Sequence, residues 1–266
     1  MSERVRSHDP ATGALVWEGP ATSPAEVEAA VARARRALPG WSGVPADERA
    51  ALARRFAALV EERADTLAAA ISAETGKPRW EARTEVASVV AKVEISIAAR
   101  AERTPDLDLD GARLRHRPLG VLAVLGPFNF PAHLPNGQIV PALLAGDTVV
   151  WKPSELAPSV AEIVRAAWRD AGLPDGVLEL VQGGPATGAA LVGADVDGVA
   201  FVGSYRTGAA IHRALAGRPE VMLALEMGGN NPLVVADVVD LGATVDLVAR
   251  SAFSTAGQRC TCARRL

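Results

Sequence analysis

The sequence predicts an α/β protein in which a mainly helical N-terminal part precedes a Rossmann-like parallel sheet. Three observations lead to this class. The first hundred residues carry apolar residues at helical spacing, short apolar runs alternate with helix-length segments from Gly120 onward, and polar clusters follow several of these runs. Short buried strands that alternate with helices are typical of a parallel sheet with right-handed crossovers. Ligands of such sheets bind at the carboxyl ends of the strands.

The first predicted helix is recognised by its start signals. Asp9–Gly13 has the composition of a turn between two short extended pieces. Ser23–Glu26 then supplies a capping serine, a proline suited to the first helical position and the glutamate of a capping box. We expect the helix to end near Leu38, because Pro39-Gly40 breaks helices.

Two longer helical patterns follow. Asp47–Glu74 repeats apolar residues at three- and four-residue steps and predicts one long helix, which Gly76 and Pro78 end. Arg79–Arg100 repeats valines and isoleucines on one face and predicts another helix.

Residues 104–118 show a different pattern, with charged residues at alternate positions. A period of two favours exposed strands that have one wet face. Two interpretations are open at this point: a solvated hairpin or linker, and a strand that pairs with another subunit.

The apolar runs beyond Gly120 define the predicted sheet. The expected strands are 121–125, 148–151, 177–181, 199–202 and 222–225. The expected helices between them are 136–145, 159–171, 186–192 and 207–215. An extended stretch at 232–236 and a helical stretch at 240–256 are expected to continue this unit.

Composition and charge exclude several classes. The 266 residues carry 28 Lys and Arg against 31 Asp and Glu, a formal net charge of −3, and 49% are hydrophobic. This excludes a disordered chain and argues against a nucleic-acid binder, since no basic excess neutralises phosphates. The sequence shows neither a signal-peptide core nor the run of about 20 apolar residues that spans a membrane. We therefore expect a cytoplasmic protein that has no nucleic-acid or membrane partner.

Cysteine and histidine spacing gives no sign of a disulfide framework or a metal site. The two cysteines, Cys260 and Cys262, are one residue apart, which fits neither. The four histidines also lack the spacing of metal ligands. We expect a reducing compartment and no bound metal.

Four polar clusters follow predicted strands, and the first is Gly126–Pro131. Its two prolines hold Asn129 in a stiff loop, because proline fixes its own φ and restricts the residue before it. From such a loop the Asn129 amide can donate a hydrogen bond to an oxyanion. Pro127 and Phe128 are candidate cofactor contacts. In the alternative interpretation Asn129 is an ordinary turn residue.

The second and third clusters can bind a nucleotide. Lys152 and Glu155 follow a predicted strand, and such a pair can bind ribose hydroxyls while the carboxylate repels the 2′-phosphate of NADP. The third cluster joins a strand to a helix, where glycine permits close backbone approach and the helix N-terminus can hold a phosphate. Its residues are Gly203, Ser204, Tyr205, Arg206, Thr207 and Gly208. Taken alone, a Lys-Glu pair more often lies on a solvated surface. A turn like 203–208, taken alone, more often simply connects a strand to a helix.

The fourth cluster contains a carboxylate and a thiol. Glu226 ends the apolar run Leu223–Leu225, a setting in which desolvation favours the protonated acid and makes the group a usable base. A hydrogen-bonded glutamate at a strand end is the alternative. Cys260 follows the last predicted helix and a glycine, so we expect it on a loop or at the start of a new element. A lone cysteine is more often an inert core residue, and we interpret Cys262 in that way.

Taken together, the clusters resemble the NAD(P)-dependent aldehyde dehydrogenase superfamily. The matching pieces, in family order, are GPFNFP, WKPSE, FVGSYRTG, LEMGGNNP and GQRC. Each is weak alone, whereas all five in this order are specific, and the resemblance covers essentially the whole chain from the DPATG segment onward. Within the family, the chain is similar to members that oxidise N-succinylglutamate 5-semialdehyde to N-succinylglutamate in the arginine succinyltransferase pathway. A dehydrogenase of another semialdehyde is the alternative.

The resemblance implies a role for each cluster. Cys260 matches the nucleophile and Glu226 the general base, while Asn129 matches the side-chain donor of the oxyanion hole. The Lys152–Glu155 pair matches contacts to the adenosine ribose of NAD, and the 203–208 turn lies near the pyrophosphate. The family holds its dinucleotide differently from a standard Rossmann enzyme, which accounts for the missing G-x-G-x-x-G pattern.

The implied chemistry explains why these residue types occur together. Hydride cannot leave an aldehyde directly, because an acylium ion would result, but addition of the Cys260 thiolate gives a tetrahedral oxyanion that can expel hydride to the nicotinamide. Asn129 stabilises that oxyanion. Glu226 then activates the water that hydrolyses the thioester, so the expected product is a free acid rather than an acyl-coenzyme A.

The resemblance also implies a domain division. Residues 1–103 form the helical part of the cofactor-binding domain, 104–118 an oligomerisation-type strand or linker, 119–236 the NAD-binding sheet, and 237–266 the start of the catalytic domain. Family members continue well beyond their nucleophile, whereas this sequence ends shortly after it. We therefore expect a truncated part of a homo-oligomeric dehydrogenase that is inactive alone. A non-catalytic NAD-binding remnant and a module that pairs through strand edges are the alternatives.

Overall fold

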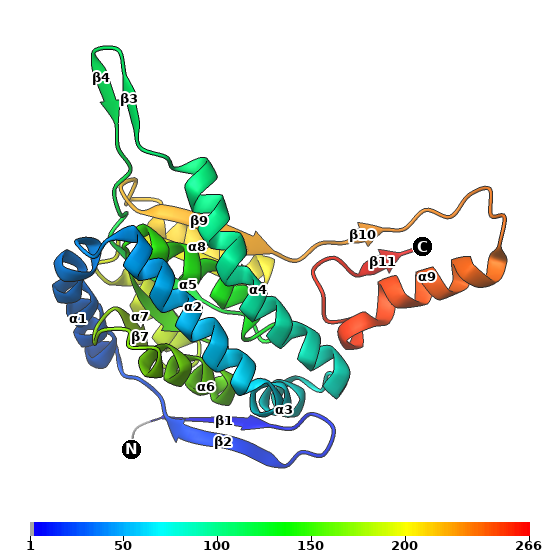
Figure 1. Cartoon of the computed structure of the whole chain (residues 1–266). Coiled ribbons are helices and arrows are strands. Elements are labelled where there is room, and N and C mark those ends of the chain that lie inside the picture. Colours follow the sequence, from blue (N-terminus) through cyan, green and yellow to red (C-terminus); the bar gives the residue numbers. More distant parts are fainter. Residues whose placement is uncertain (1–2) are drawn as a thin grey trace.

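A five-stranded parallel sheet lies at the centre of the computed structural model, which describes residues 3–266 (Figure 1). Its strands are β5 (Val121–Leu125), β6 (Thr148–Lys152), β7 (Leu178–Leu180), β8 (Gly198–Gly203) and β9 (Met222–Met227). They lie in the order β7-β6-β5-β8-β9, and every neighbouring pair is parallel. The chain moves outward from β5 to β7 and then returns to β8 on the other side of β5. This reversal opens a crevice at the carboxyl ends of the strands, and the predicted α/β class is confirmed.

Helices cover both faces of the sheet, so its central strands are buried on both sides. All residues of β5 and β6 are buried, as expected for continuous apolar runs in a parallel sheet. On one face, alternate β5 residues pack with α1 (Pro24–Ser42), α7 (Pro185–Gly193) and α8 (Tyr205–Leu215). The remaining β5 residues pack with α2 (Ala46–Glu62), α3 (Ala64–Thr75), α4 (Arg79–Arg103), α5 (His133–Ala145) and α6 (Pro158–Asp170).

The first helix starts as predicted but runs further. Ser23 and Glu26 form the expected capping box. The predicted end near Leu38 is wrong, because the helix continues through Pro39 to its final residue, Ser42. Packing outweighs the missing proline N–H here: Trp41 is buried, and its indole N–H donates to the Leu143 carbonyl at 3.1 Å.

The single long helix predicted over 47–74 is wrong, since two helices occupy this stretch. α2 and α3 meet at Arg63, whose backbone leaves the helical region at φ −98° and ψ 15°. No glycine or proline marks this break in the sequence. The Arg63 guanidinium instead pairs with the Asp170 carboxylate of α6 at 2.7 Å, a contact between distant segments.

Two antiparallel hairpins lie outside the main sheet. β1 (Arg4–His8) and β2 (Leu15–Pro20) flank the predicted turn at 9–13. β3 (Leu107–Leu109) and β4 (Ala112–Leu114) form a hairpin that projects from the body of the molecule, and all six of its strand residues are exposed (Figure 1). Residues 104–118 thus contain a hairpin, while pairing with another subunit stays a prediction.

The C-terminal part does not continue the main sheet, so the expectation for 232–236 is wrong. β10 (Asn231–Pro232) pairs with β11 (Ala263–Arg265) in a separate two-stranded sheet (Figure 1). Pro232 has no N–H for a ladder hydrogen bond, and two glycines separate it from β9. Between these strands lie α9 (Leu241–Phe253), which has no buried side chain, and the short 3-10 turn η1 (Ser254–Gly257).

The helix predicted over 240–256 ends earlier in the structure, at Phe253. Thr255 and Ala256 adopt left-handed φ values of 59° and 55°, which an α-helix cannot accommodate. None of the helices described between residues 3 and 266 is long and apolar enough to cross a membrane.

Candidate functional site

A cleft of about 1100 Å³ lies at the carboxyl ends of β5, β6, β8 and β9. Residues from all four predicted clusters line it, although they come from distant parts of the sequence. The predicted site residues in its wall are Pro127, Phe128, Asn129, Lys152, Glu155, Gly203, Ser204, Arg206, Thr207, Glu226 and Cys260. A cleft of this size suits an extended organic ligand.

Two residues of the predicted nucleotide turn lie outside the cleft lining. Tyr205 is 74% exposed and is not part of the wall. Gly208 is buried where α8 approaches β9, and a Cβ added there would lie 2.6 Å from the Met227 sulfur. The glycine thus permits close packing of a helix against a strand.

The β6 end of the cleft holds a buried cation beside a carboxylate. The Lys152 side chain is 8% exposed, and its Nζ donates to the Pro153 carbonyl at 2.8 Å and lies 3.6 Å from Glu155 Oε2. Burial lowers the pKa of Lys152, and the nearby Glu155 carboxylate opposes that shift. An ammonium donor and a carboxylate acceptor in one wall can bind neighbouring hydroxyls of a sugar.

The β8 end of the cleft provides donors for an anion. Ser204 caps α8, since its Oγ accepts the Thr207 backbone N–H at 3.2 Å. The first turn of the helix presents unpaired N–H groups and the positive end of its dipole, and Arg206 lines the cleft beside it. The two ends of the cleft together fit the ribose and the phosphates of a dinucleotide.

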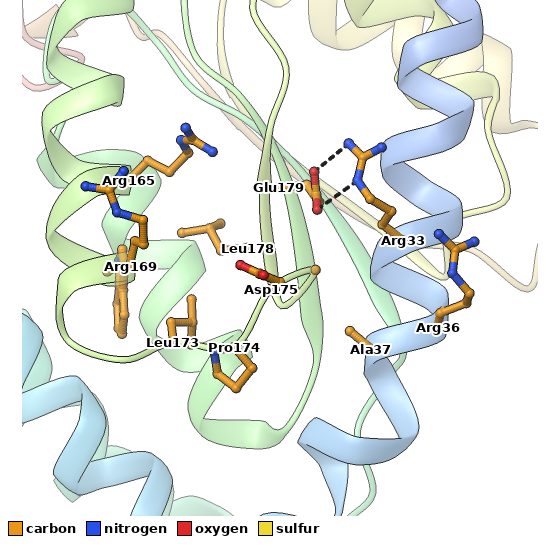
Figure 2. Close-up of a pocket in the computed structure, with 12 residues that line it drawn as sticks. Arg33, Arg36, Ala37, Arg165, Arg169, Leu173, Pro174, Asp175, Leu178 and Glu179 are labelled. Atoms are coloured by element: carbon orange, nitrogen blue, oxygen red, sulfur yellow. Dashed lines mark hydrogen bonds and ion pairs between the residues drawn. The ribbon is translucent and has the colours of Figure 1, made fainter.

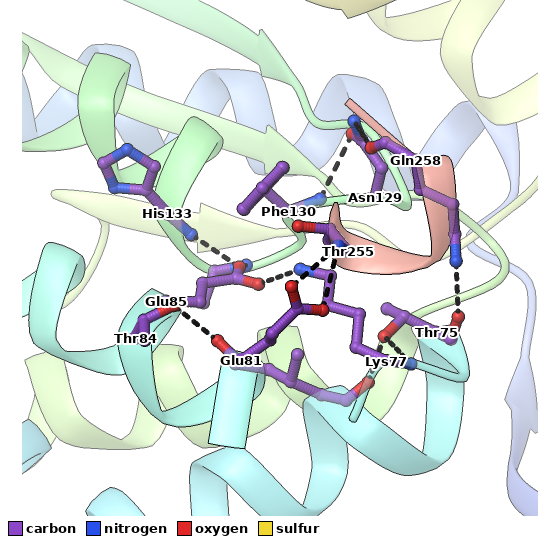
Figure 3. Close-up of polar contacts among 12 residues, drawn as sticks. Thr75, Lys77, Glu81, Thr84, Glu85, Asn129, Phe130, His133, Thr255 and Gln258 are labelled. Atoms are coloured by element: carbon purple, nitrogen blue, oxygen red, sulfur yellow. Dashed lines mark hydrogen bonds and ion pairs between the residues drawn. The ribbon is translucent and has the colours of Figure 1, made fainter. Parts of the chain in front are cut away.

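Asn129 lies beside the loop that carries the predicted nucleophile. Its Nδ2 donates to the Gln258 carbonyl at 2.6 Å, and its Oδ1 accepts the Phe130 backbone N–H at 3.1 Å (Figure 3). The fold thus brings the predicted oxyanion donor within two residues of Cys260.

Cys260 is exposed, whereas Cys262 is buried, as predicted for a core thiol. Asn231 holds this loop from the β10 side, because its Nδ2 donates to the carbonyls of Cys260 at 2.5 Å and Cys262 at 3.0 Å. Sequence reasoning assigned no role to Asn231 or Gln258. Both lie inside the motifs LEMGGNNP and GQRC, which is the signal that could have identified them.

Glu226 lines the same cleft as Cys260, but its surroundings differ from the expectation. The side chain is exposed, so the prediction of a desolvated carboxylate at the end of an apolar run is wrong for the described chain. β9 is the edge strand of the sheet and is covered incompletely, which explains the exposure.

The cleft wall is positively charged although the chain carries net negative charge. Five basic side chains line it, against two acidic ones, Glu155 and Glu226. The basic residues are Lys92, Lys152, Arg206, Arg259 and Arg264. His133 also lines the cleft, and burial lowers its pKa, with Lys92 and Lys77 adding to the shift and Glu85 opposing it. This wall suits anionic ligands.

A second cavity, of about 600 Å³, lies between α1 and α6 beside the edge strand β7 (Figure 2). Four arginines line it, and one of them, Arg33, forms two hydrogen bonds with Glu179 at 3.1 and 2.7 Å. None of the predicted site residues borders this cavity, so it is separate from the strand-end cleft.

Among residues 3–266, no group of three or more His, Cys, Asp or Glu side chains could hold a metal ion.

Comparison with known proteins agrees with this geometry. The family profile described as "Aldehyde dehydrogenase family" matches residues 1–266. A protein of Burkholderia mallei named N-succinylglutamate 5-semialdehyde dehydrogenase is 61% identical over 265 residues, which make up 98% of this chain and 54% of that protein. A protein of Paraburkholderia xenovorans with the same name is 60% identical with the same coverage. The chain spans about half the length of the curated relatives it matches.

Solved structures show the same fold. A mutant of aldehyde dehydrogenase C from Pseudomonas syringae, complexed with NAD+ and octanal, matches with a TM-score of 0.93 at 34% identity, over 98% of this chain and 54% of that chain. An NADP-dependent glyceraldehyde-3-phosphate dehydrogenase from Bacillus halodurans, complexed with NADP, matches with a TM-score of 0.91 at 32% identity, over 98% and 57%.

Proposed function

This chain belongs to the aldehyde dehydrogenase family, and from that premise we propose that its strand-end cleft oxidises an aldehyde to a carboxylic acid with NAD. One observation carries the proposal. Asn129, Glu226 and Cys260 come from three separate segments, yet they line one cleft together with the candidate dinucleotide contacts.

In the proposed reaction the Cys260 thiolate adds to the aldehyde carbonyl carbon. Asn129 has two amide N–H groups, and the hydrogen bond to the Gln258 carbonyl uses one of them, which leaves the other for the oxyanion. NAD, when bound, supplies the hydride acceptor. Glu226 then takes a proton from the water that attacks the Cys260 thioester, which releases the acid and the thiol.

Lys152, Glu155 and the start of α8 are the proposed NAD contacts. Lys152 and Glu155 bind ribose hydroxyls, and Ser204, Arg206 and Thr207 lie near the pyrophosphate. The Glu155 carboxylate repels a 2′-phosphate, so NAD should bind more tightly than NADP. Titration calorimetry tests this, because Glu155→Gln should raise NADP affinity relative to NAD, and an unchanged ratio contradicts the assignment.

The proposed substrate is N-succinylglutamate 5-semialdehyde, and the proposed product is N-succinylglutamate. Curated relatives at 57–61% identity carry that activity in their names. The positively charged wall of the cleft suits an aldehyde that bears two carboxylates. A neutral aldehyde of similar length is the matched comparison, and equal reactivity of the two aldehydes would favour another substrate.

The domain division of the family is proposed for this chain as well. Residues 1–103 and 119–236 form the cofactor-binding part, 104–118 contact another copy through the exposed hairpin, and 237–266 bring the nucleophile. We expect residues 1–266 alone to oxidise the aldehyde slowly or not at all. Cys260 and Glu226 are exposed in the described chain, which leaves the reaction open to bulk water.

Acyl capture at Cys260 tests the function without requiring turnover. The chain is incubated with NAD and the semialdehyde, and mass spectrometry measures one acyl adduct on Cys260 while absorbance measures NADH. Cys260→Ala should lose the adduct and retain NAD binding. An adduct or NADH formation that persists in Cys260→Ala refutes the nucleophile, and NAD binding without any adduct favours a non-catalytic binding protein.

A further inference from the structure

Two glutamates on one face of α4 hold the two loops that form the candidate site. Glu85 Oε1 accepts the backbone N–H groups of Ala132 and His133 at 3.0 and 3.1 Å, beyond Asn129 in the same loop. Both oxygens of Glu81 accept the Thr255 backbone N–H, at 2.8 and 2.9 Å (Figure 3). Residues four positions apart project from the same side of a helix, so one face of α4 reaches both loops.

Both carboxylates are buried, so water cannot take the place of their hydrogen bonds to the two loops. Glu81 is 5% exposed and Glu85 is 1% exposed. Lys77 forms an ion pair with Glu85, and its charge also acts on Glu81, whose carboxylate bonds to the backbone of the Cys260 loop. A hydrogen bond to an ionised acceptor is stronger than one between neutral groups, and in a buried site water cannot replace it.

The backbone that Glu81 holds has an unusual conformation. Thr255 and Ala256 have φ values of 59° and 55°, and Gly257 follows at 71°. A β-branched residue such as threonine rarely adopts positive φ, and such a conformation persists only where its surroundings hold it. Besides the Glu81 bond, the Arg259 Nε donates to Thr255 Oγ1 at 2.6 Å, and Thr255 is 1% exposed.

The held turn leads directly to the nucleophile. Gln258 follows it and donates its Nε2 to the Thr75 carbonyl at 3.0 Å, while its own carbonyl accepts the Asn129 amide. Cys260 lies two residues further on. The path of the loop past Asn129 therefore depends on the turn keeping its left-handed conformation.

We infer that Glu81 is a positioning residue whose carboxylate holds the turn at 255–257 so that Cys260 lies in the cleft beside Asn129. This inference rests on the proposed role of Cys260. Glu81 need not touch substrate or cofactor, since it acts through the Thr255 backbone. A role limited to overall stability is the competing explanation, so the test needs a readout of where the Cys260 thiol lies in the folded protein.

The ratio of Cys260 alkylation rates with iodoacetate and iodoacetamide supplies that readout. Both reagents react with the thiolate, so the thiolate fraction cancels in the ratio, and the ratio reports the charge around the sulfur. The cleft wall carries five basic and two acidic side chains. At about 10 mM salt we expect the folded chain to give a ratio about threefold above that of the urea-unfolded chain. Tandem mass spectrometry assigns the label to Cys260.

Glu81→Ala and Glu81→Gln form a matched pair. Both remove the same negative charge, but only glutamine keeps a carbonyl that can accept the Thr255 N–H. We expect Glu81→Ala to lower the ratio to that of the unfolded chain and Glu81→Gln to keep it near the wild-type value. Glu94→Ala, at an exposed position of α4, serves as a control that should leave the ratio unchanged.

Cys262 reports whether each variant stays folded, because its buried thiol should not react. If Glu81→Ala exposes Cys262, Glu81→Asp takes its place, since it keeps the charge but draws the carboxylate away from Thr255. A wild-type ratio equal to that of the unfolded chain overturns both the proposed site and this inference. A raised wild-type ratio that the folded Glu81 variants leave unchanged overturns the inference alone.

Discussion

Replacing Lys77 with methionine should destabilise the chain far more than breaking an ion pair on its surface. Lys77 and Glu85 form an ion pair in which the side chains are 1% and 0% exposed. Methionine has a similar length and volume, so the change removes the charge and leaves little empty space. The Glu85 carboxylate keeps its bonds to Ala132 and His133 but loses its counter-charge.

The expected loss follows from this burial. Removing one partner of a buried pair leaves an uncompensated charge and costs about 3–5 kcal/mol. The Lys77 ammonium also lies 3.8 Å from the centre of the Phe130 ring, a contact that contributes about 1 kcal/mol. We therefore expect Lys77→Met to lower the free energy of unfolding by about 4 kcal/mol. Lys77→Met combined with Glu85→Gln should cost less than Lys77→Met alone, because the unpaired charge of Glu85 is removed as well.

Urea unfolding followed by circular dichroism at neutral pH measures these losses. Arg54→Met is the matched control, because Arg54 also pairs with a glutamate of α4, Glu94, but the side chains are 53% and 63% exposed. Arg54→Met should lower the free energy of unfolding by at most about 1 kcal/mol. The reasoning fails if Lys77→Met costs no more than Arg54→Met, or if the double variant is less stable than Lys77→Met.

Three further changes have defined outcomes. Burial lowers the pKa of His133 below its usual 6.5, so the unfolded chain takes up the proton first as the pH falls. The free energy of unfolding should therefore decrease below about pH 6.5, and urea titrations should show a smaller decrease for His133→Gln. Gly208→Ala places a Cβ 2.6 Å from the Met227 sulfur, so it should lower the free energy of unfolding by about 1 kcal/mol and weaken NAD binding in calorimetry. Gly217→Ala is the control, because a Cβ there meets nothing within 4 Å and should change neither quantity. Ser23→Ala removes the capping box of α1 and should cost about 1 kcal/mol in urea unfolding.

Sequence patterns predicted the centre of the sheet well, because the central strands β5 and β6 are buried on both faces. The predicted strand 121–125 has the same bounds as β5, and 148–151 differs from β6 by one residue, since a continuous apolar run marks such a strand. The polar clusters beyond these strands were therefore assigned to the correct edge of the sheet.

Features set by contacts between distant segments could not be predicted in this way. The break at Arg63 has no turn signal in the sequence, and the exposure of Glu226 follows from the place of β9 at the sheet edge. The valine face of α4 was recognised, whereas Glu81 resembled any surface acid of an amphipathic helix. Its partner, Thr255, lies 174 positions away, a pairing that periodicity along one helix does not reveal.

The four-residue spacing of Glu81 and Glu85 also restricts insertions within α4. An inserted residue between them rotates one glutamate by about 100° around the α4 axis relative to the other, so only one of the two loops keeps its carboxylate. The tip of the β3–β4 hairpin is different, because Gly111 is exposed and a Cβ there meets nothing within 4 Å. Insertions should therefore be tolerated at this tip, whereas we expect a single added residue between 81 and 85 to displace the Cys260 loop relative to the Asn129 loop.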